Sequence, residues 1–423
     1  MATAASDDRA AAAAVPTGPA HVAVVSFLAS RAAPTGGFWI ALAGGVALAR
    51  AAERRGARLG FGASAAAMLE TVAIIGPARF GIPLTQAASA PMLGRLEARC
   101  VAILPQILAC AAIRLLHNAA TTAFFIWVIT GGLDAYAGTY DAIGRRIGIE
   151  VGTADALAVT AASLLAWAAF ASTVQVLVYR RGLRAWDRLE ASSAPGLDHG
   201  PGSGPALGPG PAPGHARNID RQIDGRRSPR EDGAGASGRR RHLDPRLVTL
   251  AAAIAFTLLL SSTAWPLLAA VAAALTLAWL ALPTDPEPVP TGLAFAAILA
   301  GGALAFALGG GLGVDEAARR ASRAALLVMV ATWMRAAAGA EGLREVARRT
   351  LGRLRRLPAA REAALVLDRI ASEGQLAAAG GALADELSGV PRRPLPFVDA
   401  VLGWVVRESE RAQAGARADT SRL

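Results

Sequence analysis

The chain has 423 residues, of which 53% are hydrophobic and only 18% charged, and its mean hydropathy is +0.39. This composition is too apolar for a soluble domain of that length and favours a helical protein that crosses a membrane several times. The net charge of +11 comes from arginine, because the sequence contains no lysine. These arginines are not interleaved with aromatic residues, which argues against nucleic-acid binding; on a membrane protein they first indicate orientation.

Residues 1–19 are rich in alanine and are predicted to be a disordered N-terminus. A first membrane module over 20–186 follows, whose apolar segments predict about six helices. Both arginine clusters, at 50–58 and 180–184, are then cytoplasmic if the chain turns at His117-Asn118. A single long helix over 100–133 is the alternative, and it separates the two clusters. The predicted segments are 20–33, 37–50, 61–77, 100–116, 119–133 and 155–179.

Residues 187–242 differ from both flanking regions in composition. Glycine and proline alternate through much of this segment, and such a sequence does not hold a helix or a strand, because proline lacks the N–H and glycine loses too much entropy. Several arginines keep the segment in the cytoplasm. We interpret it as a flexible linker between two membrane halves.

A second membrane module is predicted over residues 243–340. It has four apolar runs, so a chain that enters from the cytoplasm returns there. Before the first run, Asp244 can cap the helix N-terminus, Pro245 suits its first turn, and Arg246 can remain at the lipid headgroups. The runs are 246–262, 265–282, 291–313 and 321–338.

From Glu341 onward the sequence is charged and helical, which predicts cytoplasmic helices over 341–423. Apolar residues recur every three or four positions in 341–357, as on a helix with one apolar face. Pro358 can open a second helix. After the proline-rich segment 391–396, a last amphipathic helix carries an apolar stripe formed by Val398, Val401, Leu402 and Val405.

These segments together predict an all-α, polytopic helical membrane protein. It has about ten transmembrane helices in two halves, counted by segment length, and cytoplasmic amphipathic helices at the C-terminus. We expect it in the plasma (inner) membrane, in contact with the lipid bilayer, as a multi-pass protein with both termini in the cytoplasm.

Two motifs in residues 242–423 resemble the transmembrane T component of energy-coupling factor (ECF) transporters. That family opens its first membrane helix with Leu-Asp-Pro-Arg, then a hydroxyl residue, Lys and Leu; the tetrad at 243–246 matches, whereas 247–249 supply no Lys. The family also has cytoplasmic coupling helices with an Ala-Arg-Gly core, preceded by a Glu-rich stretch and Ala-Gln. Residues 408–419 are similar to this element, with one residue inserted and Gly replaced by Ala.

The resemblance implies a membrane component of an ECF-type ABC importer of a small molecule, a vitamin or a metal ion. Its partners would be ABC ATPase subunits and a substrate-binding membrane subunit, to which it transmits ATPase motion. The resemblance assigns Arg417, with Glu408 and Gln413, to the ATPase contact, since Arg pairs bidentately with carboxylates. The alternative is that Arg417 is an ordinary surface residue of a C-terminal tail. By analogy alone, 20–186 would be an S-component-like module.

Five polar residues lie at membrane depth in the first half, where polar groups are costly and often functional: Glu70, Arg114, His117, Asn118 and Gln175. Glu70 needs a partner or a cavity, and Arg114 is the obvious opposite charge. The two form either a structural pair between helices or part of a substrate site. His117 and Asn118 more readily form an interfacial turn than a metal or catalytic site.

No constellation of an enzyme is found in the sequence. A phosphate-binding loop needs a lysine that the chain lacks, and no His/Cys spacing is typical of a metal site. We therefore predict no catalytic residue, no metal and no cofactor, and expect ATP hydrolysis to come from another chain. Two alternatives stay open: an intramembrane enzyme with Glu70, Arg114 and His117 in one cavity, and a membrane scaffold without transport.

Overall fold

The computed structural model describes residues 16–32, 37–77, 83–193, 243–370, 372–391 and 393–421, and these residues form helices and connecting loops without a strand. The first half contains α2 (Thr17–Ala32), α3 (Gly37–Arg55), α4 (Ala57–Ile75), α5 (Pro83–Ala98), α6 (Ile103–Phe124), the π-helix η2 (Phe125–Thr130), α7 (Leu133–Arg146) and α8 (Thr153–Ser193). The second half contains α10 (Pro245–Ser261), α11 (Trp265–Ala281), α12 (Val289–Gly309), α13 (Val314–Arg353), α14 (Pro358–Leu367), α15 (Glu373–Ser388) and α16 (Pro394–Ser421).

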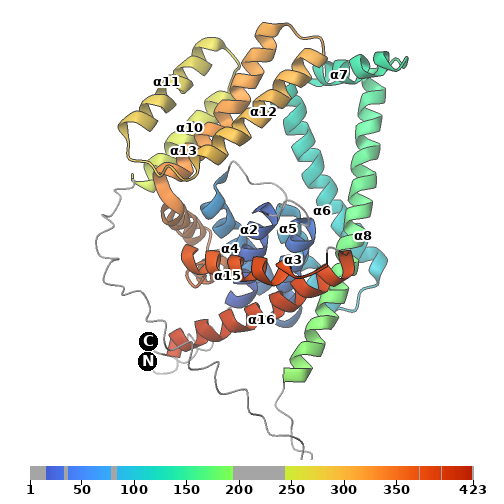
Figure 1. Ribbon diagram of the computed structural model, residues 1–423, viewed down its shortest axis with the longest axis vertical. Helices are drawn as coiled ribbons and strands as arrows, with labels where there is room; N and C mark the ends of the chain where they lie inside the picture. The colour runs from blue at the N-terminus through green and yellow to red at the C-terminus, as the bar shows by residue number, and fades with distance from the viewer. Residues whose placement is uncertain are drawn as a thin grey trace, which may run out of the picture. The chain divides into compact units, whose positions relative to one another are not determined.

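The two halves pack as one compact unit, made by the described residues of 1–188 and 242–423. Within it, α10, α11 and α12 pack around the first part of α13 (Figure 1). The C-terminal helices contact the first half instead: α14 packs against α4, and α16 against α2 and α3. Residues 189–241 belong to a second unit, most of which lies outside the described residues.

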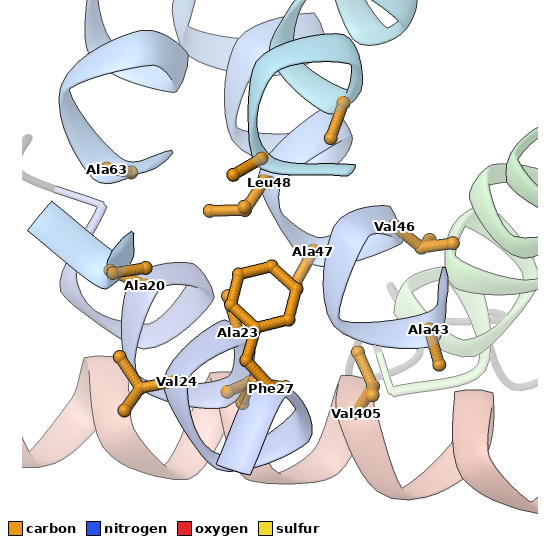
Figure 2. Packing of buried hydrophobic residues seen from close by; sticks show 14 of the residues in the cluster. Ala20, Ala23, Val24, Phe27, Ala43, Val46, Ala47, Leu48, Ala63 and Val405 are labelled. Carbon is orange, nitrogen blue, oxygen red and sulfur yellow. The ribbon is translucent and has the colours of Figure 1, made fainter. Parts of the chain in front are cut away.

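Helix α3 is the centre of the largest hydrophobic core. Every residue from Ile40 to Ala52 is buried, as expected for a helix that is apolar on all sides and enclosed by other helices. Side chains of α2, α4 and α16 surround it, among them Phe27 and Val405 (Figure 2). The stripe of the last helix, predicted from the sequence, faces this core: its four members Val398, Val401, Leu402 and Val405 are at most 3% exposed.

Five helical segments are long and apolar enough to cross a membrane, which indicates a multi-pass membrane protein. Helices α10 and α11 are also apolar but have only 17 residues each. Of the roughly ten membrane helices predicted, the structure thus supports five long helices and offers two shorter candidates. The other predicted membrane helices stay a prediction. The five segments are Ala57–Ile75, Ile103–Thr130, Thr153–Arg188, Val289–Gly309 and Val314–Arg353.

The predicted turn at His117-Asn118 is wrong. Residues 103–124 form one α-helix that continues into η2, so the alternative of a single long segment is correct. No Pro or Gly lies between Gln106 and Thr130, and a polar pair alone does not end a helix. The chain instead stops the helix at Gly131, whose φ of +83° suits glycine.

Three short helices were not predicted: α5, α7 and α15. They are rich in small or charged residues and lack a long apolar run. Arg50 and Arg54 of the first arginine cluster each bind Asp187 of α8, at 2.7 and 2.9 Å. Because Asp187 follows Arg184 by three residues, the first cluster lies beside the end of the second, and their cytoplasmic side stays a prediction.

The beginning of the second half agrees with its sequence. Asp244 accepts a hydrogen bond from the backbone N–H of Arg246 at 2.9 Å, and Pro245 is the first helical residue of α10. Pro358 opens α14 as predicted. The linker begins later than predicted, because α8 continues to Ser193; the rest of 194–242, like residues 1–15, lies outside the described residues.

We predict that Gly94→Ala destabilises the protein, because a Cβ at Gly94 would lie 1.9 Å from the backbone oxygen of Ala49. Helices α5 and α3 would have to separate, at a cost of about 1–3 kcal/mol. Thermal unfolding in detergent measures this, with Gly381→Ala as control. Gly381 is helical with nothing near its Cβ, so Ala there stabilises by up to ~1 kcal/mol. Equal melting temperatures for the two variants would contradict the close approach.

Candidate functional site: the contact between α4 and α13

Helix α13 is interrupted at Gly339, which has φ +69° and ψ 168°. This conformation is accessible almost only to glycine. The interruption releases the carbonyl oxygen of Ala336 from its helical partner, and that oxygen instead accepts a hydrogen bond from the N–H of Asp285 at 2.9 Å. The loop between α11 and α12 is therefore attached to α13 at its kink.

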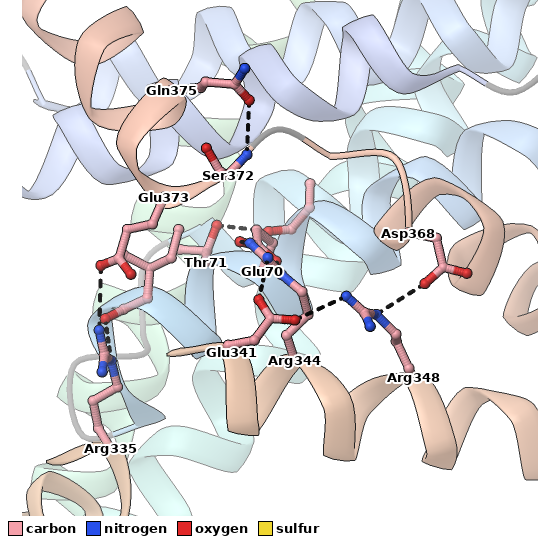
Figure 3. Close-up of polar contacts among 12 residues, drawn as sticks. Glu70, Thr71, Arg335, Glu341, Arg344, Arg348, Asp368, Ser372, Glu373 and Gln375 are labelled. Carbon is pink, nitrogen blue, oxygen red and sulfur yellow. Dashed lines mark hydrogen bonds and ion pairs between the residues drawn. The ribbon is translucent and has the colours of Figure 1, made fainter. Parts of the chain in front are cut away.

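Beyond the kink, Arg344 of α13 binds Glu70 of α4 through two hydrogen bonds (Figure 3). Its Nε donates to Glu70 Oε2 at 2.7 Å, and its Nη2 donates to Oε1. Glu70 is completely buried, and the Arg344 side chain is 10% exposed. This bidentate geometry is the strongest that an arginine and a carboxylate can form.

Before the kink, Arg335 also reaches α4. Its Nε donates to the backbone oxygen of Ile74 at 2.7 Å, and its Nη2 lies 3.4 Å from Glu373 at the start of α15 (Figure 3). The two arginines flank Gly339 and hold the last two turns of α4. The kink in α13 is therefore held in place by a helix of the first half.

Further charges extend this contact toward the surface. Arg344 Nη1 donates to Glu341 at 2.7 Å, and Arg348 Nη2 donates to the other oxygen of Glu341 at 3.1 Å. Arg348 Nε is 2.9 Å from Asp368, just after α14 (Figure 3). The chain of charges therefore joins α4, α13 and the segment behind α14.

Helix α14 approaches α4 closely at Gly62. A Cβ at that position would lie 2.5 Å from Cβ of Glu362. Glu362 also pairs with Arg58, near the start of α4. Helix α4 is thus held near its first turn by α14 and near its last turn by α13.

The sequence-based pairing of Glu70 with Arg114 is wrong. Glu70 binds Arg344, whereas Arg114 donates from Nη2 to Gln175 Oε1 of α8 at 2.6 Å. Sequence position favoured Arg114 because it lies inside an apolar run of the first half, and Arg344 was assigned to a cytoplasmic face. The structure brings that face against α4.

The five polar residues of the first half do not form one site, although Arg114 binds Gln175. Glu70 and Arg114 bind different partners, and His117 and Asn118 lie on α6, half-buried and within the helix. The hypothesis of an enzyme cavity shared by Glu70, Arg114 and His117 therefore loses its geometric basis. Among the described residues, no three His, Cys, Asp or Glu side chains are grouped as they would be around a metal ion.

Two of the three residues predicted to contact an ATPase instead contact another helix of the same chain. Glu408 is only 8% exposed, and its Oε1 lies 3.6 Å from Nε2 of His21 on α2. Gln413 accepts a hydrogen bond from the N–H of Gly18 at 3.0 Å. Gln413 therefore attaches α16 to α2, and Glu408 is buried beside the same helix. Arg417 is part of α16, but its side chain lies outside the residues that the structure describes.

Sequence reasoning missed Gly339, Arg335 and Arg344 as members of this site. Two of them left a signal: Gly339 interrupts a strongly helical run, and Arg344 directly follows Leu343 of the apolar stripe. A charged residue beside the buried face of a helix can meet a buried partner. The partner could not be named, because it lies 274 residues away.

We predict that Glu70→Gln and Arg344→Met each lower the unfolding free energy by about 3–5 kcal/mol. Glu70→Gln leaves the buried Arg344 guanidinium without its carboxylate, and Arg344→Met leaves the buried Glu70 carboxylate without its cation. The double variant should recover much of that loss, since it removes both charges. Unfolding in a denaturant series, analysed as a double-mutant cycle, measures the coupling. Arg349→Gln removes an exposed pair with Glu345 and should cost less than ~1 kcal/mol; an equally small effect of Glu70→Gln would refute the buried pair.

We also predict that Gly339→Ala lowers the unfolding free energy by about 1–3 kcal/mol, because alanine is strained at this backbone conformation. Gly352→Ala, in the same helix and with nothing within 4 Å of its Cβ, is the matched control. It should be neutral or stabilising. If alanine at 339 were as well tolerated as at 352, α13 would not be kinked there.

No family model matches the chain, and comparisons with curated proteins and with solved structures find no match. The resemblance of residues 242–423 to an ECF T component rests on its two short motifs alone.

Proposed function

We propose that the chain is a membrane component of an ECF-type ABC importer of a small molecule, a vitamin or a metal ion. In this proposal, ATPase subunits bind the C-terminal helices, and their motion passes to the membrane helices and to a substrate-binding unit. The observation that carries the proposal is the buried Glu70–Arg344 pair. It connects a first-half helix to the helix that links the second membrane module with the C-terminal region.

Helix α13 supports such a transmission role by its length. Its first part packs with α10, α11 and α12, and its last part packs with α14. A displacement of the C-terminal helices therefore acts on the membrane bundle through one helix. The glycine conformation at 339 offers a place where the two parts of α13 can change their angle.

The C-terminal helices also contact the first half directly. Helix α16 packs on α2 and α3, and Arg181 of α8 binds Asp399 of α16 at 2.8 and 3.0 Å. A displacement of α14 and α16 by bound ATPase subunits would thus move α2, α3, α4 and α8 together. That arrangement suits a unit whose substrate site opens and closes with the ATPase cycle.

The outer side of α16 is available to a partner. Glu410, Ala414 and Gly415 are exposed and precede Arg417 by at most two turns. Because Glu408 and Gln413 face α2, the proposal assigns the ATPase contact to this exposed side and to Arg417. An arginine at a helix end can enter an acidic groove with bidentate pairing.

We predict that an ABC ATPase copurifies with the tagged chain from its native membrane in gentle detergent, and that Arg417→Glu abolishes this recovery. Arg146→Glu, the same charge change at the exposed C-terminal end of α7, should leave recovery unchanged. Quantitative mass spectrometry of the eluates measures the ratio of ATPase to chain. Absence of any ATPase with the unmodified chain would contradict the proposal, and equal recovery with Arg417→Glu would reject Arg417 as the contact.

A further inference from the structure

A second buried polar cluster lies where α5, α6 and α8 meet. Arg114 of α6 donates to Gln175 Oε1 at 2.6 Å, and Gln175 Nε2 donates to Ser89 Oγ of α5 at 2.6 Å. Ser89 in turn donates to the backbone oxygen of Thr85 at 2.5 Å. Arg114 is 5% exposed, Gln175 1% and Ser89 2%. The cluster is therefore separated from solvent on all three helices.

Arg114 has no acidic partner among the described residues. Its only hydrogen bond there is with the neutral amide of Gln175. The ionisable groups that act on its charge are the phenol of Tyr179 and the thiol of Cys110, which are uncharged at neutral pH. A buried guanidinium without a counter-charge is strongly unfavourable, because desolvation is not offset. Arg344, by contrast, has Glu70 and Glu341.

Other buried polar atoms on the same three helices can still donate a hydrogen bond. In the described parts of α5, α6 and α8, four buried side-chain atoms have no hydrogen-bond partner: Gln86 Nε2, Arg114 Nε, Ser172 Oγ and Tyr179 Oη. On α8, Ser172, Gln175 and Tyr179 follow a spacing of three and four residues and share one face. Gln86 and Ser89 share a face of α5 in the same way. The cluster thus has one positive charge, several unused donors and no anion.

We propose that this cluster binds a small monocarboxylate with an apolar body. A carboxylate carries the single negative charge that Arg114 lacks and can accept about four hydrogen bonds, which suits the four unpartnered donors. Guanidinium and carboxylate are also matched in shape. A dianion would need a second cation, and the cluster has none.

The apolar body follows from the surroundings of the cluster. Ala90, Leu93 and Val176, which share helices with its polar residues, are at most 1% exposed and belong to the main hydrophobic core. The apolar spans that contain α6 and α8 are each only 17% buried, which is the lowest share among the five spans; that of α12 is next, at 22%. We therefore expect a ligand with an apolar body to enter from the bilayer side of these two helices.

As a statement about substrate class, this inference rests on the proposed importer function. As a statement about a binding site, it concerns the first half alone, since all members lie on α5, α6 and α8. Binding is therefore measured on the purified chain without an ATPase. Carboxylate binding without ATPase capture would keep the site and reject the importer, and the reverse result would do the opposite.

The experiment compares butyrate, hexanoate and benzoate with butyramide, hexanamide and benzamide in chloride-free buffer. We expect at least one acid to raise the melting temperature in a concentration-dependent manner. The matched amide should bind about tenfold or more weakly, because it lacks the charge. A chloride titration is run alongside, and a chloride response equal to that of every carboxylate would overturn the assignment of a carboxylate site.

Variants of Arg114 test whether the charge is responsible. Arg114→Gln keeps a donor for Gln175 but removes the charge, so it should abolish the shift with carboxylates and should not lower the melting temperature without ligand. Arg184→Gln, an exposed arginine of α8, is the control and should respond like the unmodified chain. If Arg114→Gln does not fold, Arg114→Lys keeps the charge without the planar fork and should weaken carboxylate binding about tenfold.

The proposal is overturned if no acid differs from its amide, or if Arg114→Gln retains the carboxylate response. It is also overturned if folded Arg114→Gln has a clearly lower melting temperature without any ligand. That result would mean that the unliganded protein is stabilised by Arg114 as it stands, and that the cluster lacks no counter-charge.

Discussion

The buried ion pair between Glu70 and Arg344 is the interaction on which the arrangement of the two halves depends. A completely buried carboxylate is tolerated only with a close and well-oriented cation. The two residues are far apart in sequence, so their pairing requires α4 to pack against α13 in the folded chain. The close contact of α14 with α4 and the kink at Gly339 are compatible with that one position of α4.

The structure distributes its charges in two different ways. At the contact between α4 and α13, acids and arginines alternate, from Glu70 to Asp368, and the charges compensate each other. In the cluster around Arg114, the described residues supply donors and one cation but no acid. The first arrangement is that of a structural joint, and the second is that of a site which needs an anion.

Much of the second half could be predicted from its residues. Asp244 and Pro245 begin α10, Pro358 begins α14, and the first three apolar runs between them became helices close to the expected bounds. The fourth run was predicted over 321–338, but it is continuous with the charged segment after it in the single helix α13. The first half was harder, because its helices are rich in alanine and several are short. Apolar segments there were read as lipid-facing, yet α3 is enclosed by other helices of the chain. Alanine-rich helices can bury against protein or lipid, and composition alone does not distinguish the two.

The sequence by itself determined the helical class, the apolar spans and the caps of several helices. These follow from local hydropathy, charge and backbone chemistry, which act over a few residues. Only the tertiary structure decided the partners of Glu70 and Arg114 and the inward position of Glu408 and Gln413. Each of those depends on which helices become neighbours, and that is settled by packing and by the pairing of buried charges across hundreds of residues.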